Sequence, residues 1–282
     1  MASMIIFSKN QLNKSYMQSI VSSKTLFNDI TLIRQTNPIV HNVTNLVVMQ
    51  TTANVLLALG ASPIMAHAAN ELLEISKLAS ALVINIGTLD DSWINAITTA
   101  QKNSLQKKIP VVFDPVGAGA TSYRTDTAKK ILNSGVDILR GNASEIMALV
   151  DTKIVTKGVD SQHQSETAIG AARALAEKYH CTVVISGATD IVVDPYREIY
   201  ITHGTPLFTK VTGMGCSATA LIGAFAAVNA DYFLAATHAM SAFTIAGEIA
   251  AKKANGPGSF HIALLDALFL LKEPDFANLN IK

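Results

Sequence analysis

The stretch VVFDPVGAGATSYRTDTAKKILNSGVDILRGN, residues 111–142, contains one complete unit of a pattern that the rest of the chain repeats. A short apolar run at 111–114 ends in a Gly-rich turn, residues 123–133 form a longer amphipathic run, and a second apolar run at 137–139 ends in Arg-Gly-Asn. Short apolar runs bounded by polar turn residues predict strands that are covered on both faces. The order strand, helix, strand predicts a parallel βαβ unit.

The same alternation extends in both directions from this unit. Further strands are predicted at 39–43, 62–66, 82–86, 183–186, 191–193 and 198–202, and further helices at 46–59, 69–79, 92–102, 143–150 and 166–179. Residues 194–197 join the last two strands as an antiparallel hairpin. The chain after Gly215 is predicted to be almost entirely helical, at 216–253 and 261–271. The pattern therefore predicts an α/β fold with a mostly parallel sheet and helices on both faces.

Composition limits the classes of function. The chain has 282 residues, a net charge of +1, 49% hydrophobic residues and 15% charged residues. A neutral balance gives no support to nucleic-acid binding. The charged fraction is below the average of about 25%, which fits either surface hidden between subunits or a large Ala-rich core. No repeat or linker interrupts the pattern, so we expect one domain over 1–282, with residues 1–29 as an N-terminal segment.

Cysteine content and apolar runs bear on location. Two cysteines, Cys181 and Cys216, are too few for a disulfide framework and fit a reducing cytoplasm. The apolar residues 4–7 are too few for a signal-peptide core. The apolar stretch at 218–228 is shorter than a membrane span. We therefore expect a cytoplasmic protein with no membrane partner.

The turn Thr-Gly-Met-Gly-Cys at 212–216 precedes a long apolar helix. Its two glycines, Gly213 and Gly215, let the backbone approach a ligand closely, and the helix start offers free N–H groups to an anion such as a phosphate. Cys216 would lie at the helix N-terminus, where the pKa of a thiol tends to fall. A plain Gly-rich turn with a buried cysteine explains the same residues equally well.

Two more polar clusters follow predicted strands. In Arg-Gly-Asn-Ala-Ser-Glu at 140–145, Asn142 and Glu145 are spaced as a helix-capping box. Alternatively, Glu145 holds Mg²⁺ while Arg140 lies near nucleotide phosphates, because Mg²⁺ prefers carboxylate and phosphate oxygens. In Asp-Pro-Val-Gly-Ala-Gly-Ala at 114–120, Asp114 either assists Mg²⁺ or is an ordinary turn residue. Ligands bind beyond the carboxyl ends of strands in open α/β sheets, so three such clusters together indicate a site.

The chain resembles the hydroxyethylthiazole kinase family of the ribokinase-like group. The resemblance covers residues 30–272, and the order and spacing of many blocks match. The blocks are PIVHNVTN at 38–45, TANVLLALGASPIM at 52–65, NIGTL at 85–89, DPVGAGA at 114–120, RGNASEIMAL at 140–149, KGVDS at 157–161, TGMGC at 212–216 and GPGSF at 256–260.

This resemblance implies a three-layer ribokinase-like fold and a homotrimer with active sites between subunits. It implies Mg²⁺-dependent transfer of phosphate from ATP to the hydroxyl of 4-methyl-5-(2-hydroxyethyl)thiazole, in thiamine salvage and biosynthesis. Met65 and Gly213 match substrate-binding positions, and Arg140 and Ser186 match nucleotide-binding positions. Cys216 matches the cysteine beside the reacting alcohol.

Three positions depart from the pattern of the family or of the wider group. Met214 stands where the family often has Thr, and Ser186 replaces Thr but keeps the hydroxyl. The wider ribokinase-like group usually has a basic Asp at the position of Cys216, so the strength of any base here is open. His41 and Asn45 either line the thiazole pocket or cap a strand end.

We expect Gly213, Gly215 and the helix start at Cys216 to hold the transferred phosphate. Mg²⁺ would be held by Glu145 and Asp114, with Asn142 and Arg140 on the nucleotide side. One rival function is phosphorylation of a hydroxymethylpyrimidine or a sugar, and the lack of Asp at position 216 weighs against it. The other rival is a binding protein without turnover, and the retained Arg140 and Glu145 weigh against that.

Overall fold

The computed structural model describes residues 21–150 and 161–281. Most of the block at 157–161 and the apolar residues 4–7 lie outside the described part of the chain. Within it, one eight-stranded sheet has the strand order β2-β1-β3-β4-β5-β6-β7-β8. The strands are β1 Ile39–Val43, β2 Ser62–Ile64, β3 Ala81–Asn85, β4 Val111–Asp114, β5 Ile138–Asn142, β6 Thr182–Ser186, β7 Asp190–Val193 and β8 Glu198–Ile201.

The first six strands are parallel, and β7 and β8 form the antiparallel hairpin at one edge. Because β1 lies between β2 and β3, the chain changes direction across the sheet at β1. Such a switch point leaves a crevice at the carboxyl ends of the strands, where ligands bind in open α/β sheets. The predicted mostly parallel sheet with a terminal hairpin is confirmed.

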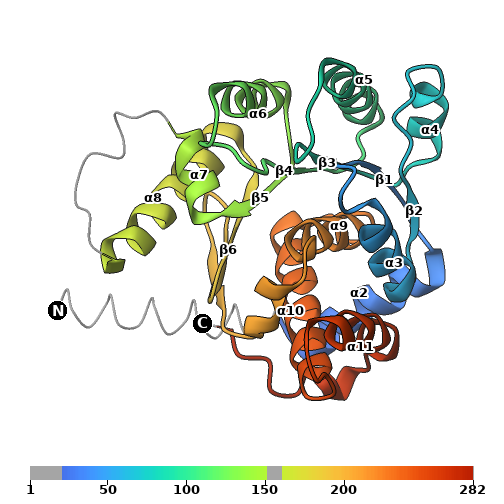
Figure 1. The fold of residues 1–282 in the computed structure, drawn as a ribbon, viewed down its shortest axis with the longest axis vertical. Helices are drawn as coiled ribbons and strands as arrows, with labels where there is room; N and C mark the ends of the chain where they lie inside the picture. The colour runs from blue at the N-terminus through green and yellow to red at the C-terminus, as the bar shows by residue number, and fades with distance from the viewer. Residues whose placement is uncertain (1–20, 151–160, 282) are drawn as a thin grey trace.

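Helices cover both faces, which gives three layers (Figure 1). One face carries α2 Ser23–Thr36, α3 Met49–Leu59, α9 Met214–Ala226, α10 Tyr232–Ala251 and α11 Pro257–Leu270. The other carries α4 Leu72–Leu78, α5 Asp91–Lys107, α6 Ser122–Ser134, α7 Ala143–Leu149 and α8 Ser161–Tyr179. Strand β3 shows why both faces need helices. Val83 packs in the apolar cluster on the α9 face, while Leu82 and Ile84 pack in the cluster on the α5 face. Successive side chains of a strand point to opposite faces, so an unbroken apolar run needs two covering layers.

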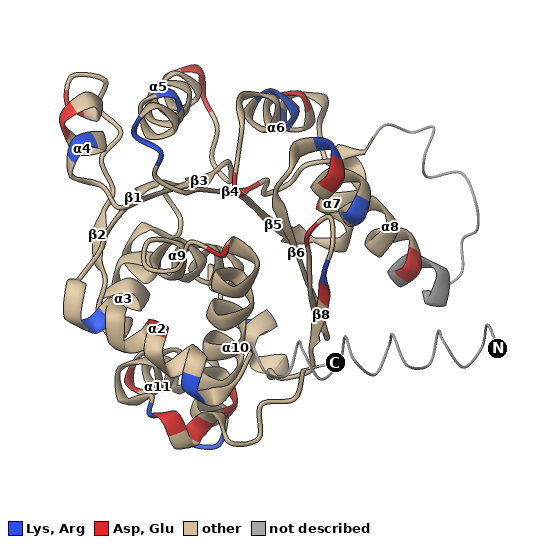
Figure 2. Cartoon of the chain, turned by 180° about the vertical axis from the view of Figure 1, so that it is seen from behind, with Lys and Arg blue, Asp and Glu red and all other residues tan. Residues whose placement is uncertain are grey.

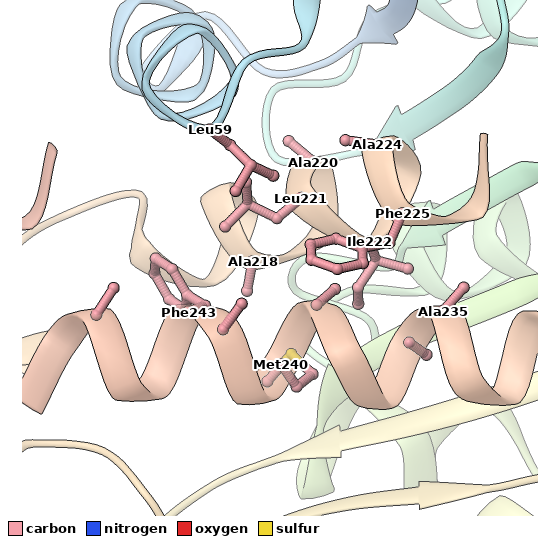
Figure 3. Packing of buried hydrophobic residues seen from close by; sticks show 14 of the residues in the cluster. Leu59, Ala218, Ala220, Leu221, Ile222, Ala224, Phe225, Ala235, Met240 and Phe243 are labelled. Atoms are coloured by element: carbon pink, nitrogen blue, oxygen red, sulfur yellow. The ribbon is translucent and has the colours of Figure 1, made fainter. Parts of the chain in front are cut away.

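Helix α9 is the central element of the first layer (Figure 3). It packs between the sheet and α10, and Ala218, Leu221 and Phe225 are fully or almost fully buried. Gly223 is the point of closest approach, because a Cβ there would lie 2.6 Å from Val83 Cγ2. Small side chains thus let α9 lie directly on the strands.

Charged residues lie on the outer helices and are absent from the buried helix α9. Lys, Arg, Asp and Glu lie on the outer helices α4, α5 and α6, whereas α9 carries none (Figure 2). Helix α10 is long and apolar enough to cross a membrane, but 83% of its apolar window is buried inside the protein. That burial is the property of a core helix, so α10 is not evidence of a membrane span.

The predicted elements differ from the observed ones mainly at their ends. Helix α2 was not predicted, although Ser22 caps it and Leu26, Ile30 and Ile33 bury one face. The long helix predicted at 216–253 is broken between α9 and α10, where the Asp231 carboxylate accepts hydrogen bonds from the first N–H groups of α10. Two short 3-10 helices, η1 Pro206–Lys210 and η2 Glu273–Phe276, were also not predicted.

Candidate active site

Four polar residues end four neighbouring parallel strands at the same edge of the sheet. Asn85 and Asp114 are opposite each other in β3 and β4, and Asn142 and Ser186 are opposite each other in β5 and β6. The N-terminus of α9 reaches this edge, since Thr219 in its second turn donates to Asp114. The sequence clusters at 114–120, 140–145 and 212–216 therefore meet at one place.

Asp114 is the centre of this cluster and is fully buried. Its Oδ2 accepts hydrogen bonds from Thr219 Oγ1 at 2.8 Å and Asn85 Nδ2 at 3.1 Å, and lies 3.7 Å from Arg140 Nη1. Its Oδ1 has no hydrogen-bond partner. Burial raises the pKa of the Asp114 carboxyl to about 6, although Arg140 and the Thr219 hydrogen bond act to lower it. A buried carboxylate oxygen without a partner is suited to a cation.

Arg140 connects the sheet to the start of α9. Its Nη2 donates to Ser186 Oγ at 2.6 Å. Gly215 makes room for the guanidinium, because a Cβ on Gly215 would lie only 2.7 Å from Arg140 Nη1. The positive end of the α9 dipole and a fixed guanidinium therefore lie side by side, which is an arrangement that binds anions.

Cys216 lies in the first turn of α9 among amide groups. Its Sγ accepts from Asn85 Nδ2 at 3.2 Å and from Asn45 Nδ2 at 3.6 Å. Burial, and secondly the charge of Asp114, raise the pKa of the Cys216 thiol to about 11. The expectation that the helix N-terminus lowers this pKa is thus wrong for the protein without ligands, because loss of water contact outweighs the dipole. The group is a neutral thiol at neutral pH.

Glu145 and Asn142 form the capping box that the sequence suggested. Asn142 Oδ1 accepts from Glu145 N, and Glu145 Oε2 accepts from Asn142 N, both at 2.9 Å. Glu145 Oε1 also accepts from Gly117 N at 2.9 Å, which ties the turn after β4 to α7. The described residues contain no group of three or more His, Cys, Asp or Glu that could hold a metal by itself. Glu145 and Asp114 fit Mg²⁺ only where phosphate oxygens and water supply the other ligands, as is usual for that ion.

A cavity of about 620 Å³ opens beside Arg140. Ser186 and Gly215 line it with Arg140, and Asn142 is not among its lining residues. Residues 202–205 form a further part of its wall, and Phe208 and Phe243 supply an aromatic part with their rings stacked 4.7 Å apart. A cavity with one cationic corner and one aromatic wall suits a nucleotide. Met214, at the position where the family often has Thr, lines the cavity as well.

The residues expected on the substrate side lie around the ends of β1 and β2. Asn45 is buried against Cys216, and Gly213, with φ +83°, lies so close to Val48 that a Cβ would be 2.9 Å from Val48 Cγ1. Met65 follows β2 and is half-buried. His41 is fully buried and its Nε2 donates to Ala66 O at 2.8 Å, so it holds the segment that carries Met65.

The structure adds two residues that sequence reasoning left without a role. Asn85 joins the others, since its amide also accepts from Asn45 Nδ2 at 2.8 Å and from Gly87 N at 2.9 Å. A polar residue at a strand end was the available signal for Asn85. Thr219 had no such signal, because a threonine inside an apolar helix reveals its partner only once the helix is placed on the sheet.

Comparison with known proteins agrees with this geometry. A model of the hydroxyethylthiazole kinase family matches residues 30–274. A hydroxyethylthiazole kinase of Syntrophus aciditrophicus (strain SB) is 51% identical over 247 residues, which are 87% of this chain and 92% of the relative. The solved structure of the hydroxyethylthiazole kinase protein from Pyrococcus horikoshii OT3 has a TM-score of 0.85 at 42% identity, covering 92% of this chain and 98% of that one.

A more distant solved structure bears on the fold alone. A ribokinase-like superfamily protein from Enterococcus faecalis V583 has a TM-score of 0.61 at 13% identity, covering 82% of this chain and 86% of that one. The ribokinase-like architecture expected from the sequence is therefore confirmed. Because the family model spans nearly all of the chain and closely similar relatives match it over most of their own length, this chain belongs to the hydroxyethylthiazole kinase family.

Proposed function

We propose that the protein transfers the γ-phosphate of ATP to the hydroxyl of 4-methyl-5-(2-hydroxyethyl)thiazole, as a step in thiamine salvage and biosynthesis. The observation that carries this proposal is the 51% identity to a kinase of that name over 87% of the chain. The geometry supports this proposal independently. The Arg140 guanidinium and the N-terminus of α9 can bind an anion, and they lie beside both the 620 Å³ cavity and the buried carboxylate of Asp114.

The nucleotide binds in the cavity beside Arg140 in this proposal. Its phosphates face the Arg140 guanidinium, the Ser186 hydroxyl and the backbone N–H groups at Gly215 and Gly213. Asn142 acts indirectly on this side, because its side chain is used to cap α7. These groups are held before ATP arrives, so little reorganisation is needed when charge moves from the γ-phosphoryl group onto the β,γ-bridging oxygen and the β-phosphate.

Mg²⁺ would be held by Asp114 and Glu145 together with phosphate oxygens. Asp114 offers the unpartnered Oδ1, and each Glu145 oxygen uses one N–H bond and retains acceptor capacity. When bound, the ion neutralises charge on the phosphates. The protein's own part is to keep Asp114 ionised, through Arg140 and the Thr219 hydroxyl.

Cys216 positions the substrate alcohol rather than removing its proton in advance. The thiol lies in the first turn of α9 beside Asn45 and Asn85, whereas Ser186 is bonded to Arg140. A loose phosphoryl transition state needs little base catalysis. The bond from the γ-phosphorus to the β,γ-bridging oxygen breaks, the substrate oxygen bonds to that phosphorus, and the hydroxyl proton leaves late to solvent or to a phosphate oxygen.

We further propose a homotrimer with active sites between subunits. Leu46 and Val47, which directly follow Asn45, are 64% and 67% exposed. Apolar side chains beside the buried polar cluster suit a site whose second wall comes from another copy of the chain. A stable monomer of 29.9 kDa with full activity in light scattering would contradict this. Both cysteines are free thiols, which suits the cytoplasm as the location.

The test is turnover with three acceptors. Purified protein with ATP and Mg²⁺ is expected to phosphorylate hydroxyethylthiazole, and to act at least about 100-fold more slowly on hydroxymethylpyrimidine and ribose, because a site built for one polar acceptor discriminates strongly. Phosphorylation of another alcohol without formation of thiazole phosphate would overturn the proposal. ATP binding without any turnover would indicate a binding protein instead.

A further inference from the structure

The cavity wall at residues 202–205 is a short loop between β8 and η1 that has few supports of its own. Thr202, His203 and Gly204 line the cavity, and Gly204 has φ +137°, which favours glycine. A loop of this kind keeps one shape only if other parts of the chain hold it.

The first support comes from α10. Glu248 Oε1 accepts from Gly204 N at 2.9 Å and lies 3.1 Å from His203 Nδ1. One carboxylate oxygen therefore fixes two consecutive residues of the loop.

The second support comes from residues 278–281, called here the C-terminal tail. Ile281 forms an antiparallel bridge with Ile201 of the edge strand β8 and is 8% exposed. The backbone N–H of Asn280 donates to His203 Nε2 at 2.8 Å, and Thr202 Oγ1 donates to the Asn280 carbonyl at 3.4 Å. The tail thus holds the loop from the side away from α10.

These bonds fix the chemical state of His203. A backbone N–H can only donate, so Nε2 must carry a lone pair and the proton must sit on Nδ1, where it is donated to Glu248. The imidazole is a neutral bridge between the tail and α10, and a charged ring could not accept from Asn280. The side chain of His203 is therefore positioned by both neighbours at once.

The tail lies outside the matched part of the family, whereas the loop lies within it. The family model matches residues 30–274, which include the cavity wall but not residues 278–281. The tail therefore contacts, from beyond residue 274, a loop that the family model matches.

We propose that the C-terminal tail is a positioning element for the nucleotide: through His203 it fixes the loop that forms one wall of the ATP cavity. This inference rests on the proposed binding of ATP in that cavity. Loss of the Asn280 bond removes one hydrogen bond and leaves a loop that ATP must order. The acceptor alcohol, which binds beyond Cys216, is not affected.

The test compares two substitutions at one position in the full chain. Asn280→Pro removes the N–H that His203 accepts, and Asn280→Ala removes only an exposed side chain and keeps that N–H. We expect Asn280→Pro to raise the KM for ATP about five- to tenfold, with the KM for thiazole unchanged. Asn280→Ala should stay within about twofold of the unchanged protein in both constants.

Two variants at Glu248 check the hydrogen bonds between His203 and α10. Glu248→Gln keeps an oxygen that can accept from both His203 and Gly204, so it should bind ATP as the unchanged protein does, whereas Glu248→Ala should weaken ATP binding as Asn280→Pro does. Equal ATP affinity of Asn280→Pro and Asn280→Ala in calorimetry would overturn the inference, as would parallel rises of both KM values with a lower Tm. ATP calorimetry needs no acceptor, so absent thiazole turnover would refute the proposed function and leave this test intact. Unchanged protein that binds no ATP would overturn both.

Discussion

The nucleotide side and the acceptor side of the candidate site are built differently. On the nucleotide side, one chain supplies a cavity of about 620 Å³ with a cationic corner, an aromatic wall and a braced loop. On the acceptor side, Asn45 is buried and Cys216 is half-buried, yet Leu46 and Val47, which directly follow Asn45, are mostly exposed. In the proposed function, a single chain would therefore hold ATP by itself, whereas the alcohol would need a surface from another subunit.

This difference follows from the topology. The parallel strands β3 to β6 each end in a polar side chain, namely Asn85, Asp114, Asn142 and Ser186. The acceptor side depends on β1 and β2, and β2 is an edge strand with only three residues. An edge has neighbours on one side only, so a wall there must come from loops or from another subunit. Each prediction below tests one part of this contrast.

The largest effect is expected from Asp114→Asn, which changes the centre shared by both sides. Loss of the carboxylate should lower kcat about 10³-fold, since charge stabilisation is the main contribution in such sites. The same change should raise stability. The pKa of Asp114 is raised from 3.8 to about 6 in the folded protein, so its ionised form opposes folding at pH 8 by up to about 3 kcal/mol.

The sign of this stability effect can be checked with pH. Below pH 3.8 the carboxyl is protonated in both the folded and the unfolded state, and its cost disappears. The Tm of Asp114→Asn should therefore exceed that of the unchanged protein by about 5 °C at pH 8, and the gap should shrink as the pH falls through about 6. A variant less stable at pH 8 would mean that the Thr219, Asn85 and Arg140 contacts outweigh the burial of charge.

Gly215→Ala should break the nucleotide side alone. Its Cβ would lie 2.7 Å from Arg140 Nη1, so the guanidinium must move away from the start of α9. We expect about a 10²-fold loss of kcat/KM for ATP. Gly170→Ala in α8 is the matched control, because nothing lies within 4 Å of its added Cβ. That control should gain about 1 kcal/mol of stability and keep full activity. Equal activity of both variants would show that the position of Arg140 does not matter for ATP.

Val47→Asp should affect the acceptor side alone. A charge on an exposed loop of a monomer is nearly neutral for stability, but a charge against a partner subunit is not. We expect weaker assembly in light scattering and about a tenfold rise in the KM for thiazole, with the KM for ATP unchanged. Tyr196→Asp, at the 91% exposed tip of the β7–β8 hairpin, is the control. If Val47→Asp assembles and acts as Tyr196→Asp does, the acceptor side is complete within one chain.

Cys216→Ala should have the smallest effect, about three- to tenfold in kcat. The pKa of the thiol is about 11, so at pH 7 the sulfur is a neutral hydrogen-bond partner, and the loss corresponds to about one hydrogen bond. Cys216→Ser should retain most of the activity. A rate that climbs tenfold per pH unit between pH 7 and pH 9, and ceases to do so in Cys216→Ala, would show that the thiolate is a true base.

Sequence reasoning located the sheet well because its strands are buried on both faces. The runs at 39–43 and 111–114 match β1 and β4 residue for residue, since a continuous apolar run ended by a polar turn has few other readings. Helix α2 was not predicted, although Leu26, Ile30 and Ile33 recur at helical spacing. The roles of Met65, His41 and the other site residues stay predictions.

The sequence predicted which residues form the candidate site, but not the hydrogen bonds and pKa values within it. The topology of parallel strands predicts that Asp114 and Arg140 lie at one edge of the sheet; Cys216 reaches the same edge through the start of α9. The raised pKa of Cys216 could not be foreseen, because it depends on how far α9 sinks into the core. The same holds for His203, whose partners lie 45 and 77 residues away in the chain.

The close contact of α9 with the sheet at Gly223 has a consequence for hydrogen exchange. All residues of α9 from Ser217 to Ala226 are buried, so their amide protons can exchange with deuterium only when the whole domain opens. The N-terminal turn of α9, which the proposal places at the phosphates, is thus joined to a fully buried helix body. Isotope uptake by the buried helix body should change little between the free and the ATP-bound protein, whereas exchange in the loop at 202–205 should slow markedly.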